Sequence, residues 1–180
     1  LKVKELMHTF GISEDDLVTS GYIELLCPSK KPLQSRMGNY EVSCDRNKLD
    51  MAMIHQELSQ SYWAKGIPKL MVEKSLRNSL CFGVFDLGTQ KQVGFARIVS
   101  DFATFAYLAD VFVIPSYRGQ GLSKLLMKCI LEHPELQGLR RICLGTQDAH
   151  GLYKKFGFEV IKEPQNWMEI KIPNIYLIKS

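Results

Sequence analysis

The sequence predicts a mixed α/β fold, and one strand together with the helix after it carries most of this prediction. Residues 104–114 are almost wholly apolar, rich in aromatic and β-branched side chains, and precede Pro115, which is typical of a strand buried on both faces. From Leu122, apolar residues recur at i, i+3, i+4, i+7 and i+8, so an amphipathic helix follows. With 180 residues, the chain is long enough to bury a real core around this pair.

The first 37 residues are predicted to form a small helical extension and a linker ahead of the main domain, residues 38–180. Gly11 separates two short helical patterns, and the two prolines of residues 27–32 indicate a linker. A helix-turn-helix can contain a similar turn, but four acidic residues surround the second pattern and no basic face accompanies it. DNA binding by this extension is therefore disfavoured.

The main domain is expected to begin with a short strand and two helices. Residues 40–44 suit a strand, residues 49–64 carry an apolar stripe at helical spacing, and residues 70–77 suit a second helix. Residues 79–86 and 92–100 are predicted strands, and the short glycine-containing loop between them indicates a hairpin.

The chain after the central helix is expected to alternate again between strand and helix. Residues 141–145 suit a strand, and residues 149–156 suit a helix that Gly157 closes as its C′ residue. Residues 158–161 and 168–172 are the last predicted strands.

Composition and charge argue against several classes of protein. No apolar run is long enough to cross a membrane, and no signal-peptide pattern is present at the N-terminus. The five cysteines are scattered without a C-x-x-C pair, so we expect reduced thiols, no metal site and a cytoplasmic location. The net charge of +4 is too small to indicate nucleic acid, although it suits an anionic cofactor.

The turn between the central strand and its helix has the features of an anion site. Gly119 and Gly121 let the backbone turn tightly, and the first amides of the helix point outward at the positive end of its dipole. Arg118 adds a forked set of donors that suits phosphate. An ordinary turn with a surface arginine explains the glycines equally well. The turn lacks the lysine of a Walker A loop and the third glycine of a dinucleotide fingerprint.

The turn instead resembles the acyl-CoA loop of the GNAT acetyltransferase superfamily. The family pattern is Arg/Gln-x-x-Gly-x-Gly/Ala, and residues 118–123 read RGQGLS, with the small Ser123 in the last position. Residues 152–158, LYKKFGF, are similar to a second family segment, Leu-Tyr-x-x-x-Gly-Phe. Two motifs in the family's order are more specific than either alone, and the resemblance covers about residues 39–172.

The resemblance implies a mixed, centrally splayed β-sheet flanked by helices. It also implies an N-acetyltransferase that moves an acetyl group from acetyl-CoA to the primary amine of a small molecule, by direct attack in a ternary complex. Thr146 occupies a position where many relatives have an asparagine that contacts the pantetheine arm. The residues implied to hold acetyl-CoA are Val111, Phe112, Val113, Arg118, Gly119, Gln120, Gly121, Leu122, Ser123 and Thr146.

Two residues are candidates for catalysis. Tyr153 matches the family's tyrosine near the CoA sulfur, so its hydroxyl is expected to protonate the departing thiolate; a core tyrosine is the alternative.

Asp110 is an acid within an apolar strand, where a carboxylate is costly unless it is paired or functional. It is expected to act as the base or as an anchor for the amine, and a structural ion pair with Arg97 is an equal alternative. Weaker candidates for the base are His55, Glu57, Asp101 and His150.

The acceptor is expected to bind near the first two helices of the main domain. Tyr62, Trp63 and His150 are candidates for its walls, although a core position is favoured for Tyr62. The sequence selects no particular amine. A homodimer is common in the family, but no surface in the sequence indicates one.

Two rival functions remain open at this point. The chain could be a CoA-sensing or partner-binding domain that has lost catalysis, which the presence of Tyr153 disfavours. It could also be a regulator whose first 26 residues form a head that binds DNA or protein.

Overall fold

The computed structural model of the protein describes residues 34–177. The helical extension and linker expected at the N-terminus lie outside the described residues as far as residue 33. Residues 34–37, which were expected to belong to the linker, form a strand, so the sheet begins four residues before the expected domain boundary.

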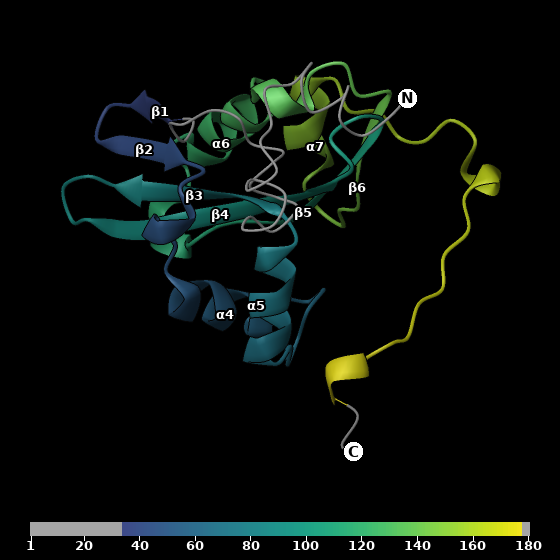
Figure 1. The fold of residues 1–180 in the computed structure, drawn as a ribbon, viewed down its shortest axis with the longest axis horizontal. Helices are drawn as coiled ribbons and strands as arrows, with labels where there is room; N and C mark the ends of the chain where they lie inside the picture. The colour runs from purple at the N-terminus through teal and green to yellow at the C-terminus, as the bar shows by residue number, and fades with distance from the viewer. Residues whose placement is uncertain (1–33, 178–180) are drawn as a thin grey trace, which may run out of the picture. The chain divides into compact units, whose positions relative to one another are not determined.

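Six strands of the described chain form one sheet in sequence order (Figure 1). They are β1 (Gln34–Met37), β2 (Tyr40–Ser43), β3 (Leu80–Asp86), β4 (Lys91–Ser100), β5 (Phe105–Val113) and β6 (Arg141–Leu144). All neighbours are antiparallel except β5 and β6, which are parallel and therefore need a crossover through a helix. This is the mixed sheet that the sequence predicts.

Helices cover both faces of the sheet. The α-helices are α4 (Met51–Gln60), α5 (Lys69–Arg77), α6 (Leu122–Leu131) and α7 (His150–Tyr153). Helices α6 and α7 lie over one face, and α4 and α5 lie over the other (Figure 1). Each face has its own apolar core, with Leu126 and Ile130 of α6 in the first and Ile54 and Leu58 of α4 in the second.

The sheet opens at β5. Its pairing with β6 ends at Leu108 opposite Leu144, so residues 109–113 continue without that neighbour. On its other side β5 carries a bulge, because Phe112 pairs with Phe95 whereas Ala109 pairs with Arg97. Together these features make the centrally splayed sheet that the family resemblance implies.

Helix α4 stops earlier than its apolar stripe predicts. The pattern extends to residue 64, but the helix ends at Gln60, and Tyr62 and Trp63 lie in the turn that follows. The cause is Ser61, whose hydroxyl donates to the carbonyl of Leu58 at 2.7 Å. A serine that bonds to nearby backbone in this way offers the chain an alternative to the next helical turn.

The prediction of two C-terminal strands is wrong. Residues 158–161 and 168–172 join no ladder in the described chain, and only the 3₁₀ turns Pro164–Asn166 and Ile175–Leu177 form along this extended segment (Figure 1). Alternation of apolar and charged residues predicts a strand, but a strand forms only where a neighbouring edge accepts its backbone hydrogen bonds.

Candidate active site

The glycine-rich turn has the backbone conformation of an anion-binding loop. Gly119 and Gly121 have φ of 79° and 82°, in the left-handed region that glycine adopts without strain. A Cβ at Gly119 would meet nothing within 4 Å, and one at Gly121 would touch only the side chain of Met37. The backbone angle therefore requires glycine here, and the space in front of the loop remains open.

The start of α6 faces a pocket of about 230 Å³. Helix α6 begins at Leu122, has ten residues and has no acid in its first turn, so its free amides and dipole favour an anion. Arg118 is exposed, and its Nε donates to the carbonyl of Val113 at 3.0 Å, which ties the loop to the end of β5. Most of the residues predicted to bind the donor line this pocket, and Lys124 adds a second cation.

The loop has a support that the sequence did not indicate. The hydroxyl of Tyr40, on β2, donates to the side chain of Gln120 at 2.6 Å. Its ring also meets that of Tyr117 edge to face, with the centroids 6.2 Å apart. Strand β2 is 80 residues away from Gln120 along the chain, so no local pattern could have revealed this contact.

Tyr153 is buried at the end of α7, with its ring edge to face against Phe158. Burial raises the pKa of its phenol to about 12, and the nearby Tyr62 and Asp148 add to the shift. A phenol with this pKa keeps its proton at neutral pH, so it can donate but not accept one. Tyr153 also packs in the α6 core, which is the alternative expected from the sequence.

Tyr153 lines a second pocket, of about 310 Å³, together with Thr146 and His150. The hydroxyl of Thr146 accepts a hydrogen bond from the amide of Ala149 at 3.0 Å and so holds the start of α7. His150 is exposed at the first position of that helix. The structure therefore brings these three predicted residues together.

Asp110 is the bulge residue of β5, and both of its carboxylate oxygens are engaged. Its φ of 55° is left-handed, which aspartate tolerates better than most residues. One oxygen lies 2.5 Å from Nε of Arg97, and the other accepts from the indole of Trp63 at 3.0 Å. The ion pair with Arg97, one of the two alternatives expected from the sequence, is therefore present.

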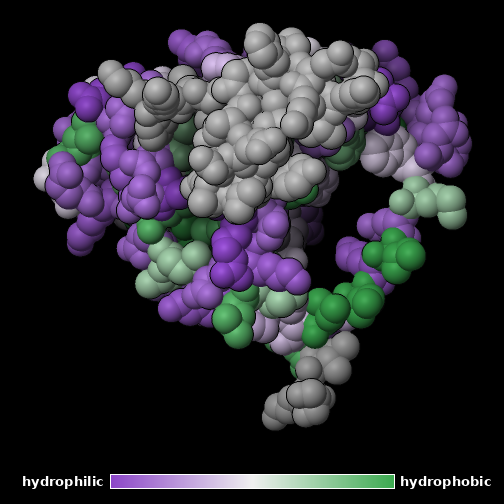
Figure 2. Space-filling view, in the orientation of Figure 1, coloured by the Kyte–Doolittle hydropathy of each residue, from purple (hydrophilic) through white to green (hydrophobic). Residues whose placement is uncertain are grey.

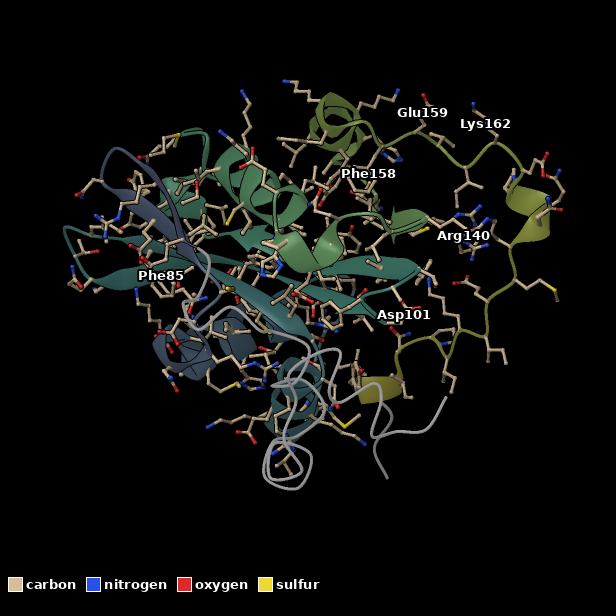
Figure 3. The ribbon with its side chains drawn as sticks, turned by 45° about the horizontal axis from the view of Figure 1, so that its top comes forward. Phe85, Asp101, Arg140, Phe158, Glu159 and Lys162 are labelled. Carbon is tan, nitrogen blue, oxygen red and sulfur yellow. The ribbon has the colours of Figure 1, made fainter. Side chains whose placement is uncertain are left out.

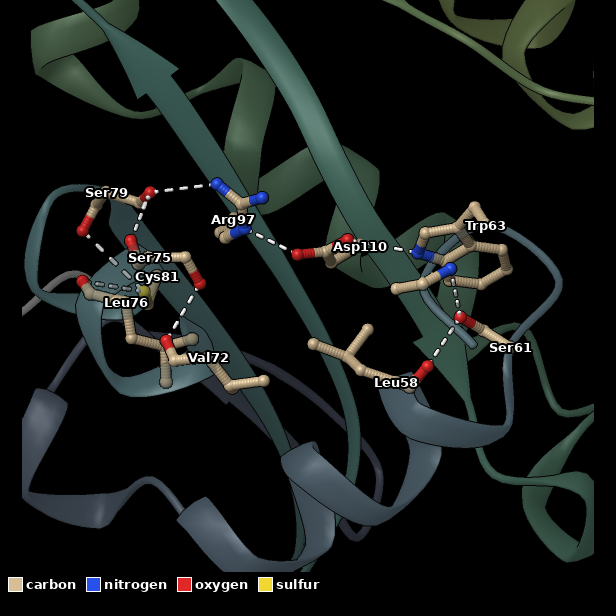
Figure 4. Close-up of polar contacts among 11 residues, drawn as sticks. Leu58, Ser61, Trp63, Val72, Ser75, Leu76, Ser79, Cys81, Arg97 and Asp110 are labelled. Carbon is tan, nitrogen blue, oxygen red and sulfur yellow. Dashed lines mark hydrogen bonds and ion pairs between the residues drawn. The ribbon is translucent and has the colours of Figure 1, made fainter. Parts of the chain in front are cut away.

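The pair belongs to a longer network. Arg97 also donates to the hydroxyl of Ser79 at 3.2 Å, and Ser79 donates to the carbonyl of Ser75 in α5 (Figure 4). This network joins α5, strands β4 and β5 and the turn after α4. Residue spacing predicts the Arg97–Asp110 pair only as a possibility, because the bulge that brings them together is a property of the folded sheet.

Tyr62 and Trp63 form an exposed aromatic pair beside this network. Their ring centroids lie 4.9 Å apart, and the residues are 59% and 45% exposed. The expected core position of Tyr62 is therefore wrong, since α4 ends before it. The hydroxyl of Tyr62 accepts from the amide of Gln147 at 3.2 Å, so the turn after α4 reaches the loop between β6 and α7.

Two of the weaker candidates for a base have local structural contacts. The carboxylate of Asp101 accepts from the amides of Ala103, Thr104 and Phe105, and these bonds together with the Thr104 hydroxyl hold its pKa well below the usual range. Nε2 of His55 lies 3.0 Å from the carbonyl of Ile67. Both residues therefore stabilise turns.

Within residues 34–177, no group of three or more His, Cys, Asp and Glu side chains could hold a metal ion. In the same part of the chain, no helix is both long and apolar enough to cross a membrane.

Comparisons with known proteins agree on one family. The family model of the acetyltransferase (GNAT) domain matches residues 77–160. A protein of Gibberella zeae that is described as an acetyltransferase is 32% identical over 146 residues, which cover 69% of this chain and 81% of the relative. Mouse thialysine N-epsilon-acetyltransferase is 32% identical over 69 residues, or 36% of this chain and 41% of that enzyme.

Solved structures show the same relationship. The crystal structure of a GNAT-family protein from Xanthomonas campestris, described as an acetyltransferase, superposes with a TM-score of 0.75 at 51% identity, and covers 78% of this chain and 99% of its own. A Clostridium acetobutylicum protein crystallised with acetyl-CoA is similar in fold, with a TM-score of 0.54 at 18% identity over 74% of this chain and 95% of its own.

Proposed function

The chain belongs to the GNAT acetyltransferase family and is an N-acetyltransferase, and we propose that it acetylates the primary amine of a small molecule by direct attack in a ternary complex with acetyl-CoA. The mouse relative is named for acetylation of such an amine, which supports this class of acceptor. The observation that carries the proposal is the left-handed pair Gly119 and Gly121 at the start of α6, facing an open pocket with Arg118 on its rim.

The donor is held in this proposal by its phosphates and by the open strand. The amides at the start of α6 and the guanidinium of Arg118 bind the pyrophosphate, because both present donors to an anion. Beyond Leu108, β5 is unpaired on its β6 side, so backbone groups of residues 109–113 face the splay. These groups bind the pantetheine arm and stabilise the oxyanion of the tetrahedral intermediate.

The chemical step needs one proton donor. The amine nitrogen attacks the thioester carbonyl, the carbon–sulfur bond breaks, and the thiolate of CoA takes the phenolic proton of Tyr153. The attacking nitrogen loses a proton to water, and water restores the phenol. The raised pKa of Tyr153 supports the donor role, because the phenol carries its proton at neutral pH when each cycle begins.

Asp110 acts as a positioning residue in this proposal rather than as the base. Arg97 and Trp63 each bond to one of its oxygens, so both oxygens of the carboxylate are already engaged by donors of the protein itself. Its role is to fix the bulge of β5 and the indole of Trp63 beside the splay. The exposed pair Tyr62 and Trp63 then forms one wall of the acceptor site.

Thermal unfolding with and without acetyl-CoA tests where the donor binds. A ligand that binds only the folded state stabilises it by about 2.7 kcal/mol at a hundredfold excess over its dissociation constant, so the midpoint should rise. Gly121→Glu should abolish the rise by placing a carboxylate at the anion site. Gly138→Glu is the matched control, because Gly138 has a similar φ of 77° and equally open surroundings.

Each outcome decides the proposal. A rise that Gly121→Glu removes and Gly138→Glu retains supports the donor site, and a panel of small amines then identifies the acceptor by release of free CoA thiol. A rise that both variants retain means that the donor binds elsewhere. No rise with acetyl-CoA or with longer acyl-CoA donors would contradict the proposed activity.

A further inference from the structure

The glycine-rich loop before α6 has two side-chain hydrogen bonds that hold its shape. Gly119 and Gly121 flank Gln120, and glycine loses more conformational freedom on ordering than any other residue. In the part of the chain that the structure describes, Arg118 donates to a carbonyl at the end of β5, and Gln120 accepts from the hydroxyl of Tyr40. The bond to Tyr40 is the one that reaches the loop between its two glycines.

Gln120 is the residue of this loop that lies outside the pocket. Within residues 118–123, only Gln120 does not line the 230 Å³ pocket in front of α6. Its side-chain oxygen accepts the 2.6 Å hydrogen bond from Tyr40. Both of its neighbours are glycine, so it is the only side chain in the middle of the loop that the rest of the protein can bind.

Tyr40 reaches the loop from the β1–β2 hairpin, which lies beside α6 (Figure 1). Met37 and Tyr40 are the pair that closes this hairpin, and directly opposite residues of an antiparallel pair point to the same face. Met37 lies against the second glycine of the loop, since a Cβ added at Gly121 would be 3.6 Å from its terminal methyl carbon. The closing pair of the hairpin therefore contacts the loop at two neighbouring residues.

A closed set of contacts fixes the position of Tyr40. Its ring meets that of Tyr117 edge to face, with the centroids 6.2 Å apart, and Tyr117 donates to Asp86 at 3.3 Å. Asp86 lies opposite Tyr40 in the ladder of β2 and β3, and it accepts from Asn39, the residue before Tyr40, at 2.9 Å. Figure 3 shows Phe85, the neighbour of Asp86, at the end of the sheet where the hairpin lies. The hydroxyl of Tyr40 is therefore presented to the loop from a fixed place.

We propose that Tyr40 is a positioning residue for the acyl donor, because it holds the loop in its anion-binding conformation before the donor binds. A loop that is already ordered loses less conformational entropy on binding, so the donor binds more tightly. Tyr40 lines neither the pocket at the loop nor the pocket at Tyr153, so it should act on donor binding and not on the chemical step. The inference rests on the proposed donor site, and it is independent of the acceptor and of the role of Tyr153.

The expected effect is modest, because the bond to Gln120 lies near solvent. The hairpin is on a largely hydrophilic part of the surface (Figure 2), and a hydrogen bond that water can replace contributes little net free energy. Tyr40→Phe removes the hydroxyl and keeps the ring against Tyr117. The dissociation constant of acetyl-CoA, measured by isothermal titration calorimetry, should rise roughly threefold to tenfold. The kcat at saturating donor should stay within about twofold, as for an interaction made equally in the ground state and the transition state.

Asn78→Ala is the matched control for this measurement. It removes a hydrogen bond of 2.8 Å to a backbone carbonyl at the end of α5, outside the donor loop and its contacts, and should leave the dissociation constant unchanged. A Tyr40→Phe variant that is less stable but binds acetyl-CoA as tightly as the wild type would overturn the inference and leave the donor site intact. A wild type that does not bind acetyl-CoA would contradict the donor site itself, and this inference with it.

A double-mutant cycle tests whether Tyr40 acts through Gln120. Gln120→Met removes the acceptor at nearly the same side-chain length. If the hydrogen bond is the cause, Tyr40→Phe combined with Gln120→Met should bind acetyl-CoA no more weakly than the weaker of the two single variants. Losses that multiply in the double variant would show two independent effects and would overturn the proposed route.

Hydrogen exchange tests the order of the loop directly. Without donor, the amides of residues 118–123 should exchange faster in Tyr40→Phe than in the wild type, because the loop opens more often. Peptides from α5 should exchange equally in the two proteins. Equal exchange in the loop would mean that it is held without Tyr40, which contradicts the inference.

Discussion

Tyr153 is a core residue, and in the proposed mechanism it is also the general acid. It packs among the residues under α6, and the same burial raises the pKa of its phenol to about 12. The sequence motif LYKKFGF predicted the role, and the helical spacing predicted the burial; neither could predict the pKa, which depends on what surrounds the ring. The added influence of Tyr62, which is 91 positions earlier in the chain, is a property of the fold alone.

Replacing Tyr153 with phenylalanine should lower kcat by roughly 100-fold, the lower end of what a positioned general acid contributes. The KM for acetyl-CoA should stay within about twofold, since the ring and its packing remain. Thiol release under saturating donor and acceptor measures this. In the wild type the rate should show no loss from Tyr153 ionisation between about pH 7 and 10, because the phenol ionises only near its pKa of about 12. Unchanged turnover in Tyr153→Phe would remove Tyr153 from the mechanism.

The elements around the splay are tied together by charge as well as by apolar packing. The network from Ser75 to Trp63 joins helix α5, strands β4 and β5 and the turn after α4 through one ion pair (Figure 4). The sequence predicted these elements and suggested the pair of Arg97 with Asp110. It did not reveal the bulge, because an extra residue in a ladder appears only once its partner strand is known.

Asp110→Asn tests this network at the level of the elements. Asparagine tolerates the left-handed conformation, so the substitution removes the charge and keeps the backbone. Arg97 is then left largely buried without its counterion, and the free energy of unfolding should fall by about 3 kcal/mol. Denaturant unfolding measures the loss, and the double variant with Arg97→Met should recover most of it.

The pH profile of Asp110→Asn separates the two roles of this residue. If Asp110 positions the bulge and Trp63, kcat/KM should fall while the shape of the pH profile is retained. Loss of the acidic limb of the profile, with no change in stability, would instead identify Asp110 as the base.

The sequence also could not predict that residues 158–161 and 168–172 stay outside the sheet. Residues 168–172 alternate apolar and charged side chains as a strand does, but the apolar ones, Met168, Ile170 and Ile172, are exposed. A strand also needs a neighbouring edge, and the sequence gives no information on which edge that is. The glycine-rich turn before α6 was predictable, in contrast, because its two glycines and Arg118 lie within residues 118–123.

Residues 34–177 form a sheet with two separate apolar cores, and the sequence predicts the central part of this arrangement. Periodicity placed the central strands and helices, and the family motifs implied the splay. What the sequence lacked were contacts between distant elements, such as Tyr40 with Gln120 and Tyr62 with Gln147. These contacts form only when helices and strands that are distant in the sequence pack together, so they depend on the complete fold.

One buried histidine should make the stability of the whole molecule depend on pH. His133 lies against Phe82 beneath the sheet, and burial lowers its pKa below 6.5. Below pH 6.5 the unfolded chain therefore binds a proton that the folded chain does not, so the free energy of unfolding falls as the pH falls towards the lower, folded-state pKa. Above pH 6.5 this contribution is constant.

His133→Asn should weaken that dependence, because asparagine does not titrate and can still accept from the amide of Glu135. Denaturant unfolding between about pH 7 and 5 measures the slopes. The variant should be less stable than the wild type at every pH because asparagine is smaller than histidine. Only the slopes of the free energy of unfolding against pH are therefore compared. Equal slopes in the two proteins would show that His133 binds its proton equally well in the folded and the unfolded chain, so that burial does not lower its pKa.

The bulge of β5 has a consequence for the length of the chain. Before the bulge, the even-numbered Leu108 points into the α6 core. After it, the odd-numbered Val111 and Val113 point into that core, and the even-numbered Phe112 packs with the α4 core. Asp110 is thus one residue more than the pairing with β4 requires, and a chain without it would return every core side chain to regular alternation. A single inserted residue therefore reverses which face of β5 each later side chain points to, while Val111 and Val113 still meet the α6 core.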